Sequence, residues 1–446
     1  FMGGTHIDAA KNLTAELPIE AIPAPEKVVL PLSMHIGAPA KPLVQPGDKV
    51  CLGQKIAAAQ GAVSSNIHAS VSGIVTGSER RFLPNGTVAT CIVIKNDGQD
   101  TLDPTISPRE SGLVLPPDEI RQLLADKGIV GMGGATFPTH VKYAPQNSGR
   151  IIDTVILNGI ECEPFITADY RVLIENAAEV IRGLKYFLKA SLANKGIIAI
   201  EANKPRAVEL LEQLTADEPN ISVVVCPEKY PQGSERHLIY AVTGRVVPER
   251  ALPSAVGVIV DNVATAMQAA RAVKEDLPCY ERIVTVSGNT VRKPGNYRVR
   301  IGTLYSHLVE QGALGLKNEP ARIISGGPMM GFSLHSLDFP VLKGTGGLLI
   351  FDHQSKLAQL PPENPCVRCG KCVDTCPMFL EPTQLFKAVK RRDWPAALAG
   401  HVGACIECGS CAYNCPAHIP LVQYIRMGKQ FIMTDGFGGH NPYYKK

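Results

Sequence analysis

The chain has 446 residues, of which 45% are hydrophobic and 19% charged, and its 45 Lys and Arg against 41 Asp and Glu give a formal net charge of +4. This length predicts about three domains of roughly 150 residues each, and so balanced a charge does not favour a nucleic-acid-binding protein. No run approaches the roughly 18 consecutive apolar residues of a transmembrane helix, and the first residues lack the charged start and apolar block of a secretory signal.

The first hundred residues predict a small all-β domain behind a loose leader. Residues 1 to about 25 end in the Pro-rich IPAPEK and are expected to be loose, whereas Val- and Ile-rich pieces separated by turn signals follow over residues 27–100. The pattern resembles the barrel-sandwich domains that carry biotin or lipoate. The lysine that would carry such a group is missing, because the corresponding turn reads NIHASVSG around His68. We therefore expect residues 1–100 to form a structural module.

Residues 101–117 form a linker by composition, and helices alternate with strands over residues 118–280. Asp118 is expected to cap a helix that ends at Gly128. Buried strands are expected at residues 151–158, 196–202 and 221–227, and one long amphipathic helix at residues 170–190. Strands that alternate with helices predict a mainly parallel sheet whose ligands bind at the carboxyl ends of the strands.

Short strands return over residues 281–351, around one helix-like stretch at 303–312, and indicate a compact α+β unit. Residues 352–425 hold most of the cysteines and several short helical spans, and residues 426–446 form a tail. The predicted fold is a multidomain α/β protein with a β-rich N-terminal domain, a parallel α/β domain, a smaller α+β unit and a cysteine-rich helical domain.

The 13 cysteines are unevenly distributed, with eight of them between Cys366 and Cys415. These eight form two runs of the spacing C-x2-C-x2-C-x3-C-P, which is typical of ferredoxins with two [4Fe–4S] clusters, where the last cysteine of each run binds the other cluster. Zinc knuckles or disulfides are the alternative, but neither explains a third cysteine at the same spacing. The predicted ligand sets are Cys366, Cys369, Cys372 and Cys415 for one cluster, and Cys376, Cys405, Cys408 and Cys411 for the other.

A glycine-rich segment, GIVGMGGATFPTHVK at residues 128–142, lies between a predicted helix and a predicted strand. That order does not suit the dinucleotide-binding fingerprint, which follows a strand. Gly131, Gly133 and Gly134 would let backbone N–H groups approach a phosphate or a flat ring without obstruction by Cβ atoms. Taken alone, a tight turn explains these glycines equally well.

Three further segments follow the glycine-rich loop, namely NGIECEP at 158–164, YPQGSERHL at 230–238 and DNVATA at 261–266. Together with the loop they resemble the flavin- and NADH-binding subunit of respiratory complex I, and GNTVRKPGNYRV and GTGGLLIF resemble that subunit's SLBB β-grasp domain. With a barrel-sandwich N-terminus and two cluster motifs, residues 3–425 resemble the RnfC family, the NADH-reacting, cytoplasmic-side subunits of the membrane Rnf complex.

The resemblance implies roles for individual residues. Gly131–Gly134 would cradle FMN, Phe137 would stack on the adenine of NADH, and Lys142 would lie at the flavin phosphate. Glu161 and Glu163 would position the flavin ring and the nicotinamide. Further FMN or NADH contacts are implied for Asn158, Gly233, Glu235 and Asn262.

The resemblance also implies the activity of a ferredoxin:NAD+ oxidoreductase within an ion-translocating complex. Its domains would be the barrel-sandwich domain, an FMN- and NADH-binding α/β domain (118–280), an SLBB domain (281–351) and a two-cluster ferredoxin-like domain (352–425). NADH or NAD+ exchanges two electrons as a hydride, a cluster accepts one electron at a time, and a flavin joins the two. No side chain is then needed as catalytic nucleophile or general base.

Partners and location follow from the same resemblance. The chain would bind the other membrane and iron–sulfur subunits of an Rnf complex, with ferredoxin as a further partner. It would lie as a peripheral subunit at the cytoplasmic face of the bacterial inner membrane, without a transmembrane span of its own.

Two alternatives stay open. The first is a soluble NADH-dependent flavin and iron–sulfur reductase, such as the cobalamin reductase of propanediol-utilising microcompartments, which has GAGGAGFP where this chain has GMGGATFP. The second is an electron conduit and scaffold that has lost its flavin. This alternative is supported by Met132 and Ile160, which replace an Arg and an Asp of the family pattern. Thr136 likewise replaces a Gly of that pattern.

Overall fold

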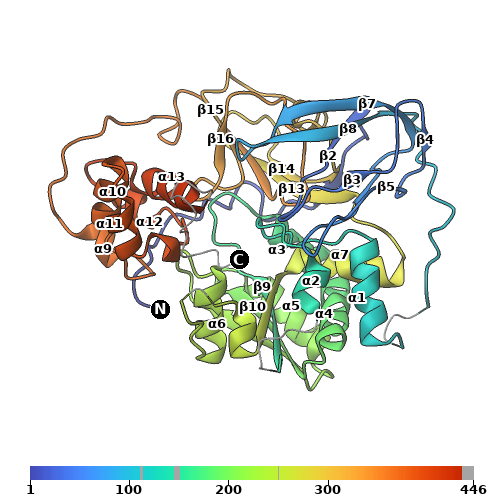
Figure 1. The fold of residues 1–446 in the computed structure, drawn as a ribbon, viewed down its shortest axis with the longest axis horizontal. Coiled ribbons are helices and arrows are strands. Elements are labelled where there is room, and N and C mark those ends of the chain that lie inside the picture. Colours follow the sequence, from blue (N-terminus) through green and yellow to red (C-terminus); the bar gives the residue numbers. More distant parts are fainter. Residues whose placement is uncertain (111–113, 145–150, 250, 434–446) are drawn as a thin grey trace.

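The computed structural model describes residues 1–110, 114–144, 151–249 and 251–433 and has a mixed α/β architecture (Figure 1). Its strands form one six-stranded sheet, two four-stranded sheets and one three-stranded sheet. In Figure 1 the N-terminal β domain lies at the top, the α/β domain lies below it, and the cysteine-rich helices form a lobe at the left. The predicted multidomain α/β fold is confirmed.

The N-terminal β domain consists of two small sheets with the strand orders β2-β8-β7-β4 and β3-β5-β6. Side chains from both sheets, such as Val28, Ile56 and Ile94, are fully buried in one core. His68, at the position where a prosthetic lysine would stand, is buried at the end of β6. The strands are β2 (Lys27–Pro31), β3 (Lys41–Pro42), β4 (Lys49–Val50), β5 (Lys55–Ala58), β6 (Ile67–His68), β7 (Gly73–Phe82) and β8 (Val88–Asn96).

The first 25 residues are not the loose leader that their composition predicted. Strand β1 (Ile19–Ala21) pairs in parallel with β14 (Gly295–Arg300) at the edge of the six-stranded sheet. Further along the segment, the N–H group of Phe165 donates to the carbonyl of Ala9. Backbone hydrogen bonds and a few partly buried side chains, such as Ile19 and Ile22, hold the segment, and these contacts leave no regular hydrophobic period in the sequence.

The α/β domain is built on a parallel sheet of order β11-β10-β9-β12, as predicted. The register pairs Asn262 with Asn158, so two of the predicted site residues lie side by side at the carboxyl ends of β12 and β9. The strands are β9 (Thr154–Gly159), β10 (Lys195–Glu201), β11 (Ile221–Cys226) and β12 (Val258–Asn262). The helices are α1 (Pro117–Asp126), α2 (Thr139–Tyr143), α3 (Ala168–Glu175), α4 (Ala177–Ser191), α5 (Pro205–Thr215), α6 (Glu235–Thr243) and α7 (Val263–Lys274).

Two expectations about these helices were wrong. Helix α1 buries the predicted apolar face, but its N-cap is Pro116, and Asp118 forms an ion pair with Arg121 instead of capping. The single helix predicted at 170–190 is broken into α3 and α4 at Asn176, whose φ of −134° lies outside the helical range. Asn is a weak helix former because its short side chain competes for nearby backbone groups.

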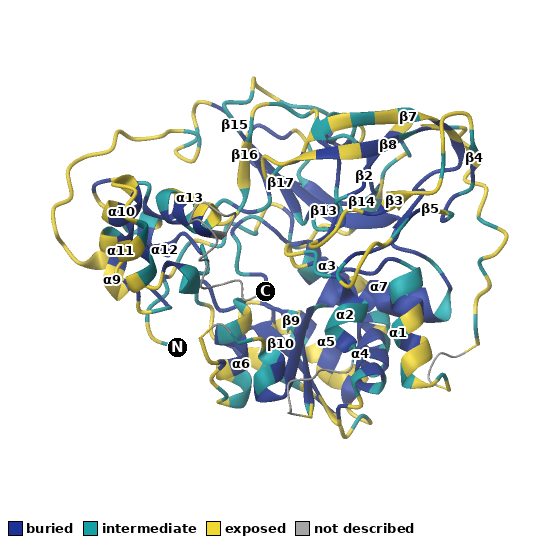
Figure 2. Ribbon diagram, in the orientation of Figure 1, coloured by how far each residue is buried: buried dark blue, intermediate teal, exposed yellow. Residues whose placement is uncertain are grey.

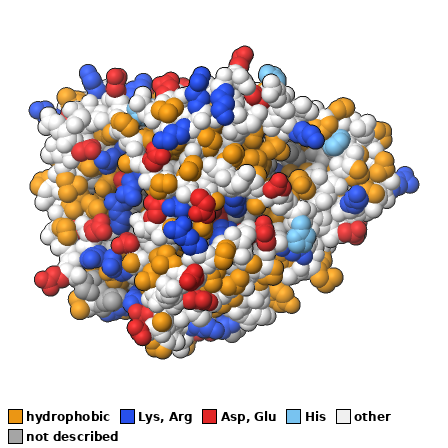
Figure 3. All heavy atoms as spheres, turned by 180° about the vertical axis from the view of Figure 1, so that it is seen from behind, with side chains coloured by type: hydrophobic (Ala, Val, Ile, Leu, Met, Phe, Trp, Pro, Cys, Tyr) orange, Lys and Arg blue, Asp and Glu red, His pale blue; other side chains and the backbone are white. Residues whose placement is uncertain are grey.

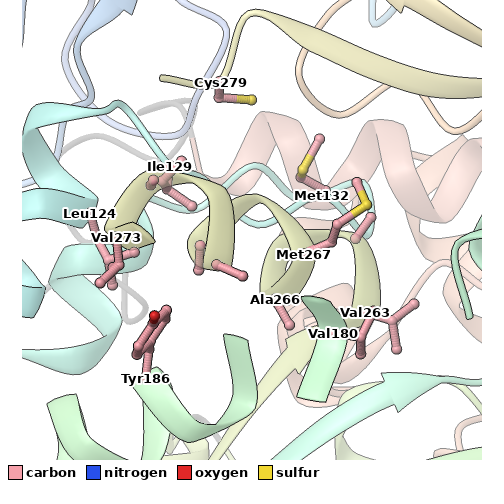
Figure 4. Packing of buried hydrophobic residues seen from close by; sticks show 14 of the residues in the cluster. Leu124, Ile129, Met132, Val180, Tyr186, Val263, Ala266, Met267, Val273 and Cys279 are labelled. Carbon is pink, nitrogen blue, oxygen red and sulfur yellow. The ribbon is translucent and has the colours of Figure 1, made fainter. Parts of the chain in front are cut away.

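Helices α1, α4 and α7 share the main core of the α/β domain. Figure 4 shows Leu124 of α1, Val180 of α4 and Met267 of α7 among the buried side chains of this cluster. The closest approach is between α4 and α7, where a methyl group on Gly183 would lie only 1.9 Å from the carbonyl oxygen of Ala266. The absence of a side chain at Gly183 therefore sets the distance between these two helices.

The β-grasp unit completes the six-stranded sheet, whose order is β1-β14-β13-β17-β15-β16. The helix-like stretch predicted at 303–312 is α8 (Tyr305–His307) followed by one π-helical turn, Leu308–Gly312. The remaining strands are β13 (Glu281–Ser287), β15 (Arg322–Ser325), β16 (Phe332–Leu334) and β17 (Gly347–Phe351).

The cysteine-rich lobe is helical and follows a long exposed connection, which Figure 2 shows in yellow along the outer left edge. The tail was expected to begin at residue 426, but α13 continues to Met433 and buries Ile432 in the core of the lobe. Residues 434–446 of the predicted tail lie outside the described residues. The helices are α9 (Lys371–Asp374), α10 (Pro382–Lys390), α11 (Trp394–Ala399), α12 (Ser410–Tyr413) and α13 (Leu421–Met433).

In the described part of the chain, no helix combines the length and apolar character that a bilayer crossing requires. Figure 3, seen from behind, shows acidic and basic side chains interspersed over the face, as the small net charge leads one to expect.

We predict that Gly183→Ala destabilises the α/β domain. The added methyl group would force α4 and α7 apart, and overpacking of this kind costs about 1–3 kcal/mol. Thermal unfolding should show a lower Tm for Gly183→Ala. The matched control is Ala178→Leu, at an exposed position of the same helix, which should leave the Tm nearly unchanged. Equal Tm values for wild type and Gly183→Ala would contradict the close packing.

Candidate functional site

Four cysteines from both runs line one hollow in the C-terminal lobe. They are Cys376, Cys405, Cys408 and Cys411, the ligand set predicted for one of the two clusters. We call this hollow the inner cluster site. The other lining residues are mostly apolar, namely Pro377, Met378, Leu380, Pro382, Leu385, Ile406, Gly409, Val422 and Ile425.

The inner site fits a multi-iron cluster better than a single metal ion. Burial raises the pKa of the Cys405 thiol to about 11, so a cationic group is needed to stabilise thiolates in this apolar hollow. Within the described ranges, no three His, Cys, Asp or Glu side chains are close enough to share one ion. A [4Fe–4S] cluster binds each thiolate through a different iron, and it therefore requires more widely spaced sulfurs.

The second predicted ligand set is less enclosed. Cys372 is buried and close enough to Cys415 for the two thiols to interact electrostatically. Cys366 and Cys369 are exposed on irregular backbone. We call these four residues the outer cluster site. The structure brings Cys372 and Cys415 near each other and leaves Cys366 and Cys369 at the surface.

The two cysteine runs nevertheless have the same backbone conformation. Left-handed φ angles occur at corresponding positions, 58° at Arg368 and 59° at Glu407, and 78° at Gly370 and 79° at Gly409. Such angles turn the chain sharply between cysteines, so that several thiols can face one cluster. The outer run is therefore already shaped like the inner run.

The glycine-rich loop lies between α1 and α2, close to the carboxyl end of β12. Gly133 and Gly134 are exposed, and nothing stands within 4 Å of where a Cβ of Gly134 would lie. A Cβ at Gly133 would approach the Cβ of Asn262 to 3.3 Å. The N–H group of Gly131 donates to the carbonyl of Phe137, which closes the loop. The loop thus presents bare backbone beside the strand ends, as a cradle for a phosphate or flat ring requires.

Two of the three departures from the family pattern, Met132 and Ile160, lie in packed positions, whereas Thr136 is half-buried with a left-handed φ of 54°. Met132 is 2% exposed, and its backbone N–H donates to the hydroxyl of Thr265; Figure 4 shows its side chain beside Met267. Ile160 is buried in the hydrophobic cluster on the other face of the sheet. These two side chains face the core, so they do not obstruct the exposed side of the loop.

Asn158 and Asn262, predicted as flavin contacts, hold neighbouring loops. Asn262 caps α7 by accepting from the N–H of Ala264 at 2.9 Å, and its amide donates to the carboxylate of Asp169 at 2.6 Å. The amide of Asn158 donates to the carbonyl of Gly233 at 2.8 Å. These bonds order the loops on which the predicted flavin site depends.

Glu161 is buried at the start of α3. Its oxygens accept from the backbone N–H groups of Asp169 at 2.8 Å and Tyr170 at 3.3 Å. Burial raises the pKa of Glu161 to about 7, against the attraction of Lys11, whose ammonium lies 4.0 Å away. Lys11 also donates to the carbonyls of Glu163 and Ile166.

Glu163 points to the β-grasp unit instead. It accepts from the N–H groups of Met329 at 3.0 Å and Met330 at 2.8 Å, and burial raises its pKa to about 7. A Cβ at Gly327 would clash with the carboxylate, so glycine is required where this loop passes over Glu163. Of the two acidic residues of the motif, Glu161 therefore binds the first turn of α3, whereas Glu163 binds the β-grasp unit.

The remaining predicted contacts surround the same end of the sheet. Lys142 donates to the carbonyl of Val260 at 2.6 Å and lies 3.4 Å from a carboxylate oxygen of Asp261. Glu235 begins α6 at an exposed position. A Cβ at Gly233 would stand 2.8 Å from the carbonyl oxygen of Ile160. The amide Nε2 of Gln232, next to Gly233, is buried without a hydrogen-bond partner among the described residues, which suits a polar ligand at this loop.

Sequence reasoning missed Lys11 and Lys343, which carry no local motif. Lys343 is 1% exposed and donates to the carbonyls of Asn66 at 2.9 Å and Gly128 at 2.6 Å. It thereby ties the barrel-sandwich turn and the start of the glycine-rich loop to the β-grasp unit. A lone lysine after a strand gives no sequence signal for such a contact.

Family models match along most of the chain. Residues 1–99 match the RnfC barrel sandwich hybrid domain, and residues 124–271 match the Nuo51 FMN-binding domain. Residues 283–333 match the SLBB domain and residues 364–419 the 4Fe-4S dicluster domain.

Two curated relatives are similar over nearly the whole length. One is the C subunit of the Na(+)-translocating ferredoxin:NAD(+) oxidoreductase complex of Acetobacterium woodii, 42% identical over 88% of each chain. The other is the C subunit of the proton-translocating ferredoxin:NAD(+) oxidoreductase complex of Clostridium ljungdahlii, 43% identical over 86% of this chain and 83% of that one.

Among solved structures, an air-oxidised NAD+-reducing [NiFe]-hydrogenase contains a chain with a similar fold. The TM-score is 0.52 at 21% identity, and the match covers 72% of this chain and 65% of that one, slightly less than two thirds.

We predict that Glu163 makes stability depend on pH. Its pKa is raised from 4.5 to about 7, so between these values the folded chain holds a proton that the unfolded chain has lost, and the free energy of unfolding falls as pH rises. Glu163→Gln should remove up to about 3 kcal/mol of this fall. Thermal unfolding at several pH values across this window compares the variant with wild type, and Glu310→Gln at an exposed position is the control. Parallel pH profiles for Glu163→Gln and wild type would contradict the prediction.

Proposed function

The chain belongs to the RnfC family of ion-translocating oxidoreductase complexes, and from this we propose that it exchanges a hydride between NAD(H) and FMN and carries single electrons through two [4Fe–4S] clusters. The activity would be that of the ferredoxin:NAD(+) oxidoreductase named for its relatives. One chain that matches both an FMN-binding domain and a 4Fe-4S dicluster domain supports this proposal.

The observation that carries the proposal is the contact between the predicted flavin site and the inner cluster site. The hydroxyl of Tyr230, in the same loop as Gly233, donates to the carbonyl of Cys408 at 2.8 Å. On a second path, Met329 donates to Glu163 through its N–H group, and its carbonyl lies against Gly409, the residue after Cys408. Redox centres bound at the two sites would therefore be held by residues that contact one another directly.

FMN would be held by the bare backbone of Gly131, Gly133 and Gly134, with Asn262 and Lys142 at the same end of the sheet. When bound, it supplies the exchange between a two-electron hydride and single electrons. The chain's own residues would bind and orient the flavin and would exclude water from it. The buried Glu161 and the half-buried Glu163 fix the loop that would face the ring, while Phe137 and Glu235 would contact NADH.

The two cluster sites suggest an order for electron transfer. The inner site adjoins the flavin loop, whereas Cys366 and Cys369 of the outer site are exposed. Electrons from NADH would therefore pass to the inner cluster first and leave through the outer cluster. The reverse order would hold for NAD+ reduction.

The proposed partners are the other subunits of an ion-translocating complex, with ferredoxin as a further electron donor or acceptor. The exposed outer site gives such a partner access to a cluster. The proposed location is peripheral, at the cytoplasmic face of the bacterial inner membrane.

An anaerobic titration of the purified chain with NADH tests the proposed function. Bleaching of the flavin absorbance together with reduced-cluster EPR signals is expected. Bleaching without cluster reduction would indicate that the cluster potentials favour electron flow towards NAD+, and reduced ferredoxin should then reduce the flavin through the clusters. Intact protein that contains no flavin would overturn the proposal and leave an electron conduit.

Cysteine variants test the proposed order. The double variant Cys366→Ser/Cys369→Ser should lose about half of the iron and keep one cluster that exchanges electrons with the flavin. Cys408→Ser should also lose about half of the iron, but its remaining cluster should no longer be reduced through the flavin. Cys51→Ser, outside both runs, is the control for iron content. If the remaining cluster of Cys408→Ser is reduced as fast as in wild type, the order is wrong.

A further inference from the structure

Tyr230 lies in the loop of Gly233, next to the inner cluster site. Its side chain is 2% exposed, and its hydroxyl donates to the carbonyl oxygen of Cys408 at 2.8 Å. Cys408 is one of the four cysteines that line the inner site. Tyr230 therefore makes a polar contact between the loop of Gly233 and a cysteine of the inner cluster site.

The backbone of Tyr230 is held by the N-terminal segment. Tyr230 and Thr5 exchange two backbone hydrogen bonds, of 2.8 and 2.9 Å. The neighbouring Gly4 donates through its N–H group to the carbonyl of Thr375, the residue before Cys376. One extended segment thus joins the loop of Tyr230 to the other cysteine run of the same site, which keeps the ring in a fixed place.

The Tyr230 hydroxyl also lies close to the carboxylate of Glu163, in the loop that follows β9. A tyrosine phenol is neutral near pH 7, because its ordinary pKa is about 10, and its hydroxyl is therefore a hydrogen-bond donor. Glu163 is itself fixed by the N–H groups of Met329 and Met330, so the surroundings of the hydroxyl are ordered.

We propose that Tyr230 is a positioning residue that sets the reduction potential of the inner cluster, through the hydrogen bond from its hydroxyl to the backbone of Cys408. The inference rests on the proposed function, because it requires a cluster at the inner site. The hydrogen of the O–H group points toward the Cys408 peptide, and this positive end of the dipole stabilises the additional electron of a reduced cluster. Hydrogen bonds in the surroundings of a cluster are known to tune its potential.

The proposed role of Tyr230 in tuning the potential can be distinguished from purely structural support. A purely structural tyrosine would be replaceable by Phe without any change in a potential, provided that the ring still packs. A tuning tyrosine would change the potential of one cluster and leave the other cluster unchanged. The outer site has no contact with Tyr230 among the hydrogen bonds of the described residues, so the effect is confined to the inner cluster.

The test is an EPR-monitored redox titration of the full-length holoprotein with Tyr230→Phe. The inner cluster is identified as the one retained in Cys366→Ser/Cys369→Ser. Its reduction should become about threefold to tenfold less favourable, where tenfold equals 59 mV for one electron, and the outer cluster should keep its potential. The matched control is Tyr297→Phe, since that buried hydroxyl also donates to a backbone carbonyl, of Lys293, at 2.7 Å, but within the β-grasp core.

A second variant covers the case in which Tyr230→Phe loses the cluster. Tyr230→3-fluorotyrosine keeps the ring and makes the hydroxyl a stronger donor, so the inner potential should shift in the positive direction. Unchanged inner potentials in the variants that retain the cluster would overturn the inference, even if NADH still reduces flavin and clusters. A wild-type chain without flavin or without an inner cluster would instead overturn the proposed function.

Discussion

The half-buried carboxylate of Glu163 is the contact on which the arrangement of the predicted redox sites depends. It comes from the loop after β9 in the α/β domain, and two backbone N–H groups of the β-grasp unit, at Met329 and Met330, hold it. Burying a carboxylate is costly unless its oxygens accept hydrogen bonds, so the β-grasp loop must stay in this place. Because the carbonyl of Met329 also lies against Gly409, the same loop fixes the position of the inner cluster site.

The domains are accordingly interleaved rather than strung along the chain. The N-terminal segment adds a strand to the β-grasp sheet, donates through Lys11 to the flavin loop and pairs with Tyr230. Lys343 joins the barrel-sandwich turn to Gly128 at the start of the glycine-rich loop. Each of these contacts links elements from different domains, so the shape of the predicted flavin site is a property of the whole chain.

The two cysteine runs have equivalent backbones but different surroundings. The inner site is walled by apolar side chains such as Leu385 and Ile425, whereas Cys366 and Cys369 follow a long exposed connection. In the proposed electron-transfer chain, the shielded cluster would exchange electrons with the flavin, and the accessible cluster would exchange electrons with a partner. The asymmetry arises from what surrounds each run, since the left-handed turns occur at the same positions in both: helices of the lobe wall the inner site, whereas Cys366 and Cys369 lie exposed on irregular backbone.

The sequence by itself determined the two cysteine runs of a 4Fe-4S dicluster domain, the parallel sheet and the position of the glycine-rich loop, because spacing and hydrophobic period act over a few residues. Only the tertiary structure decided that the helix breaks at Asn176, that the first 25 residues are bound, and which cluster site adjoins the flavin loop. Tyr230 and Cys408 are 178 positions apart, and no local pattern records such a contact. Contacts of this kind depend on how the domains pack, which a single sequence read by its motifs does not reveal.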